Sequence, residues 1–94
     1  MPSLPDYDEV RCQTAALYAG TTRVNGFAFR AGQGLPEHAV PAEAFLIVTE
    51  GAARVTIGDT SHDLGAGDGV VLPADVPHAL VATADARAVL VRAR

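Results

Sequence analysis

The fold of this 94-residue chain is decided by the stretch Gly67-Asp68-Gly69-Val70-Val71-Leu72-Pro73-Ala74-Asp75-Val76-Pro77-His78. Its glycines, prolines and aspartates mark a turn, a short apolar strand and a second turn. A histidine then begins the next apolar run, so we expect His78 to point inward. This order of elements predicts a barrel-like β domain with a polar side chain presented inside its core.

The same pattern of short apolar runs separated by turn residues continues on both sides of that stretch. Short, often β-branched runs that we expect to be strands are 23–29, 45–48, 53–57, 70–72, 79–82 and 88–91. Turns are expected at 50–51, 58–59 and 65–68, where glycine tolerates unusual backbone angles. The alanine-rich residues 13–19 have room for one helical turn. We therefore predict an all-β domain over 10–94, preceded by an extended or loosely attached arm over 1–9.

Composition limits the classes of function. A chain of 94 residues with 49% hydrophobic content forms one small domain, and a homodimer would give it extra stability. The net charge of −4 and the lack of any basic run argue against nucleic acid as a partner. No stretch is apolar enough for a membrane span or a signal peptide, so we expect a cytoplasmic protein. The lone Cys12 is expected to act as a small hydrophobe.

Two motifs in the chain resemble those of the cupins, small jelly-roll barrels whose motifs frame a metal or ligand site. The second motif has a glycine, a proline and a histidine at the spacing of Gly67, Pro73 and His78. Asp75 replaces a further glycine of the motif, and aspartate also tolerates a turn. Ala82 stands where an asparagine is common. The resemblance implies that this chain is a single cupin jelly-roll β-barrel.

The first cupin motif is half present, over the span from Gly32 to Gly51. Its two glycines and its first histidine are kept, the histidine as His38. Its second histidine is replaced by Val40 and its glutamate by Ala44. Glu43 lies one residue out of register and should point away from the site unless a bulge redirects it. The resemblance thus implies the fold together with a reduced set of metal ligands.

His38 and His78 form the predicted pair of site residues. Two imidazoles hold a divalent ion only with water or another protein ligand, whereas catalytic zinc sites typically have three protein ligands. The resemblance implies Mn, Fe, Ni or Zn if a metal is bound, and Glu43 and His62 are the further candidate ligands. The alternative for both histidines is packing, with each ring hydrogen-bonded to backbone or water.

The rest of the expected pocket is apolar, because alternate strand residues share a face. We expect the ligand pocket to be lined by Phe27, Phe29, His38, Val40, Ala44, Leu46, His78 and Leu80. Arg30, at the edge of its strand, is a candidate partner for a ligand carboxylate, with a surface ion pair as the alternative.

Three functions stay open on this basis. The first is a module that binds a small organic molecule, oriented by His38 and His78. The second is a metal-dependent enzyme, which the resemblance implies would be a dioxygenase or an isomerase, or a metal-free enzyme using one histidine as acid or base. The third is a structural cupin that acts through dimerisation or as a partner of another protein.

Overall fold

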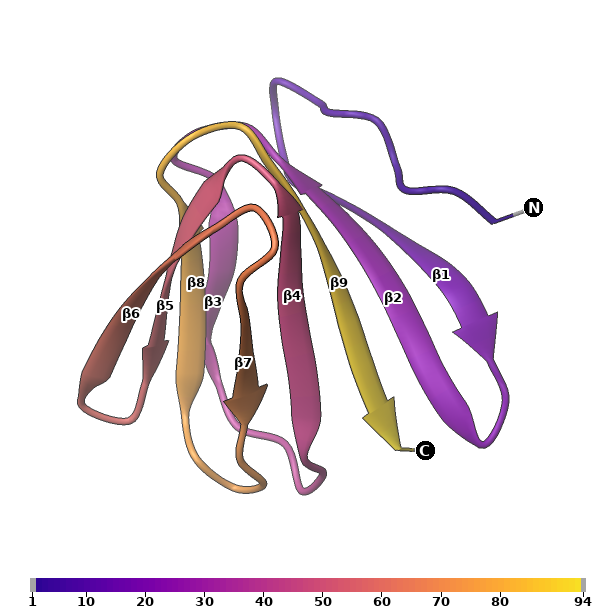
Figure 1. The fold of residues 1–94 in the computed structure, drawn as a ribbon, viewed down its shortest axis with the longest axis vertical. Coiled ribbons are helices and arrows are strands. Elements are labelled where there is room, and N and C mark those ends of the chain that lie inside the picture. The colour runs from indigo at the N-terminus through magenta and orange to yellow at the C-terminus, as the bar shows by residue number, and fades with distance from the viewer. Residues whose placement is uncertain (1, 94) are drawn as a thin grey trace.

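The structure, a computed structural model, describes residues 2–93, which form nine β-strands (Figure 1). The strands are β1 Gln13–Ala19, β2 Thr22–Phe29, β3 Gly34–His38, β4 Ala44–Glu50, β5 Ala52–Ile57, β6 Thr60–Gly65, β7 Gly69–Leu72, β8 His78–Ala82 and β9 Ala86–Ala93. They form a five-stranded sheet in the order β1-β2-β9-β4-β7 and a four-stranded sheet in the order β3-β8-β5-β6. All pairs are antiparallel, which confirms the all-β prediction. Residues 2–93 contain no helix long and apolar enough to cross a bilayer.

The helical turn expected at residues 13–19 is wrong, because this segment is strand β1. It pairs along its length with β2, from Gln13 opposite Ala28 to Ala19 opposite Arg23. Alanine has the highest intrinsic helix propensity, but propensity is a weak preference, and pairing with a neighbouring strand overrides it. The runs expected to be strands all lie within strands of the structure.

The core lies between the inner faces of the two sheets. Phe29 of β2, Val48 of β4 and Val55 of β5 are its largest fully buried side chains. The Phe29 ring stacks on that of Phe27, with 5.8 Å between the ring centroids. Cys12 packs against the same core as a partly buried hydrophobe. These contacts join the sheets around one apolar interior.

Among the positions with positive φ, Gly51 and Asp75 lie where the chain is tied to a neighbouring segment. Gly51 has φ +76° where the chain crosses from β4 in one sheet to β5 in the other, and a side chain there would collide with the carbonyl of Asp85. Asp75 has φ +63° in the loop between β7 and β8. Its amide donates a hydrogen bond of 2.8 Å to the carbonyl of Val40, so this turn is tied to the loop after β3.

Replacing Asp75 tests whether the left-handed turn limits stability. We expect Asp75→Gly to be at least as stable as the parent protein, and Asp75→Ala to be about 1 kcal/mol less stable than Asp75→Gly, since alanine has a steric penalty at positive φ. The free energy of unfolding in urea measures this. The matched control is Ala74→Gly, which should lower stability because φ is not positive there. Equal stabilities for Asp75→Gly and Asp75→Ala would contradict the expectation.

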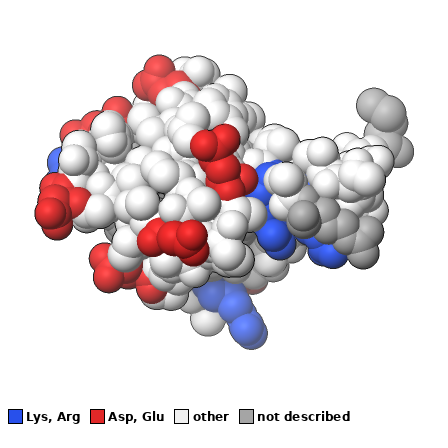
Figure 2. Space-filling view, turned by 90° about the horizontal axis from the view of Figure 1, so that it is seen from below, with Lys and Arg blue, Asp and Glu red and all other residues white. Residues whose placement is uncertain are grey.

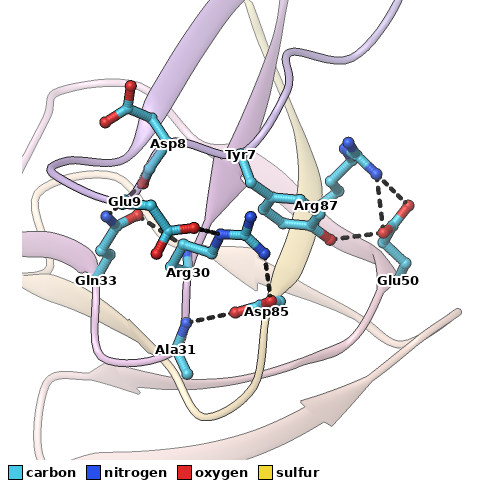
Figure 3. A network of polar contacts seen from close by, with 9 residues as sticks. All are labelled: Tyr7, Asp8, Glu9, Arg30, Ala31, Gln33, Glu50, Asp85 and Arg87. Carbon is cyan, nitrogen blue, oxygen red and sulfur yellow. Dashed lines mark hydrogen bonds and ion pairs between the residues drawn. The ribbon is translucent and has the colours of Figure 1, made fainter.

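The N-terminal arm is fastened over the end of the barrel where β2 and β4 end and β9 begins (Figure 3). The Tyr7 ring lies between two guanidinium groups, 4.8 Å from Arg30 and 4.3 Å from Arg87. Its hydroxyl donates a 2.6 Å hydrogen bond to Glu50, which also accepts two 2.9 Å hydrogen bonds from Arg87. Residues 2–12 form no strand of their own, so these side chains hold the arm to the barrel.

Arg30 belongs to this same cluster. Its guanidinium pairs with Asp85 at 2.7 Å and with Glu9 at 2.9 Å. Asp85 also accepts a 2.9 Å hydrogen bond from the amide of Ala31, and these bonds lower the pKa of its carboxyl. Of the two possibilities for Arg30, the structure shows the surface ion pair, because two acidic side chains of the protein pair with its guanidinium.

The outer face of the five-stranded sheet carries an apolar row. Phe45 of β4 stands opposite Val91 of β9 and Val71 of β7. Phe45 and Val71 are 43% and 47% exposed. Large apolar side chains side by side on an open sheet face are typical of association surfaces. The homodimer expected from the sequence stays a prediction, and this row is where we expect the second copy to bind.

A charge placed in this row tests the homodimer. Phe45→Glu is expected to yield monomer where the parent chain forms a dimer, because the buried interface would then contain an unpaired carboxylate. Size-exclusion chromatography with light scattering measures the mass. Val81→Glu is the matched control, since Val81 is 41% exposed on the other sheet. A parent protein that is monomeric, or a Phe45→Glu protein that remains dimeric, would refute the expectation.

Candidate functional site

An apolar cavity of about 170 Å³ opens at the end of the barrel opposite the arm. In Figure 1 this is the lower end, where β3 ends and β8 begins. The five-stranded sheet contributes Phe27, Leu46, Leu72 and Leu90 to its wall. The four-stranded sheet contributes Leu35, Val55, Ala79 and Leu80, together with His38 and His78. The two imidazoles are therefore the titratable groups of an otherwise apolar wall.

A bulge in β3 brings the two histidines together. Leu35 stands opposite Leu80 of β8, and His38 stands opposite His78, so β3 uses three steps where β8 uses two. Strict alternation would place Leu35 and His38 on opposite faces, but the extra residue turns both into the cavity. The bulge contains Pro36, which has no amide hydrogen to donate to a ladder.

The imidazole rings meet edge to face, with 4.4 Å between their centroids. Nδ1 of His38 lies 2.9 Å from the carbonyl oxygen of Pro36, and Nδ1 of His78 lies 3.3 Å from that of Val76. Because a carbonyl oxygen can only accept, each Nδ1 carries the hydrogen. In the neutral rings the lone pair is therefore on Nε2, which can accept a hydrogen bond or bind a metal.

Burial is the main cause that lowers the pKa of His78 below its usual value of 6.5. The neighbouring His38 lowers it further, and the hydrogen bond to Val76 opposes the shift. The His78 side chain is only 8% exposed. At neutral pH it is therefore an uncharged hydrogen-bond acceptor.

A wider hollow of about 470 Å³, called the mouth here, adjoins the cavity on its open side. Both spaces are lined by His38, Leu72, His78 and Leu90, so the histidines stand where the two meet. The mouth is completed by Val40, Pro41, Ala42, Ala44 and Arg92. Of the residues predicted for the pocket, Phe27, Leu46 and Leu80 line the cavity, Val40 and Ala44 line the mouth, and the histidines line both.

Three of the predicted residues lie elsewhere. Phe29 is 1% exposed in the core and lines neither space. His62 is half-buried on β6 opposite Val55, and it lines neither space. Glu43 is exposed and lines an outer hollow next to the mouth, but it does not line the mouth itself. Alternation along a strand correctly separates faces but does not show how deep a residue sits.

Arg92 is the residue of the mouth that sequence reasoning missed. It lies two positions after Leu90 on β9, so the two side chains share a face of the strand. The pattern Ala86, Ala88, Leu90, Arg92 contains this signal, since three inward residues are followed by a charged one at the same spacing. The prediction ended this strand at residue 91 and so left the arginine outside it.

The motif spacing and the jelly-roll topology are matched by a family model for the cupin domain, over residues 27–92. The chain belongs to the cupin family. Protein SchB of Streptomyces halstedii is 38% identical to this cupin over 88 residues, which cover 88% of the chain but 62% of SchB. The chain therefore spans less than two thirds of the length of that curated relative.

Solved structures share the fold. An RmlC-like cupin protein from Desulfovibrio desulfuricans is 25% identical with a TM-score of 0.87, covering 99% of this chain and 92% of its own. KdgF from Halomonas sp. is 21% identical with a TM-score of 0.84, covering 100% of this chain and 96% of its own. These similarities support the barrel architecture of this cupin.

The side chains around the histidines do not fit a metal held by three protein ligands. Among residues 2–93, no three or more His, Cys, Asp or Glu side chains lie close enough together to hold an ion. Val40 and Ala44 carry no donor atom at the positions where the cupin motif has a histidine and a glutamate. The charged side chain of the mouth is Arg92, which repels a divalent cation.

The lowered pKa of His78 predicts a loss of stability in mild acid. The unfolded chain binds a proton near pH 6.5, while the folded protein binds it only at lower pH. The contribution of His78 is therefore intact above about pH 6.5 and is lost as the pH falls from there through the folded-state pKa. We expect the free energy of unfolding to fall less between about pH 7.5 and 5 in His78→Gln than in the parent. Identical pH dependence in both proteins would contradict this.

Proposed function

We propose that this cupin binds a small organic molecule, with an apolar part in the cavity and a hydrogen-bonding group at the Nε2 atoms of His38 and His78. The observation that carries the proposal is the pair of imidazoles at the junction of the apolar cavity and the open mouth. Small-molecule sites characteristically combine an apolar wall with a few convergent polar groups.

The size of the cavity indicates the size of the apolar part. Its volume of about 170 Å³ is close to that of an engineered apolar cavity of about 150 Å³ that holds benzene. One six-membered ring, or an aliphatic group of that size, therefore fits between the sheets. The remainder of the ligand would lie in the mouth, which has about 470 Å³ of space.

The orientation of the histidines supports their role as acceptors. A backbone carbonyl lies within hydrogen-bond distance of each Nδ1, which favours one orientation of each ring. A site that is ordered before binding loses little entropy when the ligand arrives. An acid–base enzyme is the second candidate, because the neutral Nε2 of His78 can also accept a proton from a bound molecule. The turnover of such an enzyme would fall as the pH is lowered, because His78 becomes protonated.

Phenol and toluene, which have the same shape, test the proposal. In a titration followed by amide chemical shifts, we expect both to perturb residues around the cavity, with Leu35, Leu46 and Leu80 among them. His38→Leu and His78→Leu should each lower the affinity for phenol about threefold to tenfold, because one hydrogen bond is lost. Each should change the affinity for toluene by less than about twofold.

His62→Leu is the matched control, since this half-buried histidine lies outside both spaces. It should change neither affinity. Shifts scattered over the surface, or equal weakening of both probes by the two cavity variants, would refute the assignment of the histidines as acceptors.

A further inference from the structure

The mouth contains a cation, Arg92, that no group among residues 2–93 neutralises. Arg92 stands in register with Ala44 of β4 on one side and with Arg23 of β2 on the other. Neither neighbour offers a carboxylate. Within residues 2–93, Arg92 takes part in no ion pair and no side-chain hydrogen bond, although its residue is half-buried. A partly buried charge without a partner is unfavourable unless a ligand or solvent compensates for it.

Other arginines of the chain show the usual arrangement. Arg30, Arg54 and Arg87 each pair with an acidic side chain at 2.9 Å or less. Arg11 and Arg23 have no such partner in the described part of the chain, but neither lines the cavity or the mouth. Arg92 is thus distinguished by its position beside the histidines rather than by the lack of a partner alone.

The residues that line the mouth favour a negative charge in it. Among the described residues its lining includes no acidic side chain, and the other ionisable members are His38 and His78. Glu43 and Arg92 both line the outer hollow, but the Glu43 carboxylate is not within ion-pair distance of Arg92. Figure 2 views the molecule from this end and shows basic surface with acidic surface beside it.

We propose that Arg92 is the specificity-determining residue for a small carboxylate ligand whose apolar body fills the cavity. This inference rests on the proposed function and names the chemical class of its ligand. The planar guanidinium presents paired N–H donors that match the two oxygens of a carboxylate. With its ring between the sheets, such a ligand presents the carboxylate to Arg92 and lies within the reach of the histidines.

Benzoate and benzamide test the proposal, because they have the same shape and differ in charge. In a titration of the full chain followed by amide chemical shifts, benzoate should bind about tenfold tighter than benzamide. Arg92→Gln should abolish this preference. It should lower the affinity for benzoate about tenfold and change the affinities for benzamide and phenol by less than twofold. Arg92→Lys should retain part of the preference, since lysine keeps the positive charge but lacks the paired N–H donors of the guanidinium.

Two controls separate direct contact from net charge. Arg23→Gln removes the same charge from the cross-strand neighbour and should reduce benzoate affinity less than twofold. Glu43→Gln should not lower the affinity for benzoate, because the Glu43 carboxylate can only compete with benzoate for Arg92. Amide spectra of each variant report whether the barrel is still folded.

The outcomes distinguish the role of Arg92 from the proposed function on which it rests. If benzamide and phenol bind in the cavity but benzoate binds no tighter, or if Arg23→Gln matches Arg92→Gln, the anion inference is overturned while the proposed function stands. If none of the three probes perturbs the cavity residues, both are overturned. A preference for benzoate that disappears only in Arg92→Gln supports both.

Discussion

One extra residue in β3 sets the content of the barrel cavity. Because the bulge lies between Leu35 and His38, both side chains face inward, and His38 comes opposite His78. Without the extra residue, strict alternation would direct His38 to the opposite face, and the cavity would be lined by a single imidazole. The edge-to-face contact of the two rings and the junction of cavity and mouth depend on this register.

Much of the fold was predictable from local signals. The turn at Gly67 and the left-handed Asp75 follow from residue types that tolerate positive φ, and the apolar runs follow from strand periodicity. Strand β1 was missed because its alanines favour a helix, and only pairing with β2 overrides that preference. The histidine pair was expected from motif spacing, whereas Arg92 was missed because the predicted strand stopped one residue early. Depth in the barrel, which separates Phe27 from Phe29, depends on packing between the sheets.

Charge is distributed differently at the two ends of the barrel. At the closed end, Arg30 and Arg87 are neutralised by Asp85 and Glu50, and they hold the Tyr7 ring between them. At the open end, Arg92 has no protein counter-ion within the described residues. The same side-chain type therefore fastens the arm at one end and is available to a ligand at the other. The acidic net charge of the whole chain gives no indication of this local arrangement.

The two histidines lie on an edge strand and on an inner strand of the same sheet. His78 belongs to β8, which is held between β3 and β5, whereas His38 belongs to β3, an edge strand that pairs with β8 alone. Edge strands interrupted by a bulge and a proline exchange their amide hydrogens through low-energy local openings. The two histidines therefore stand on strands held to different degrees, since β8 is hydrogen-bonded along both edges and β3 along one.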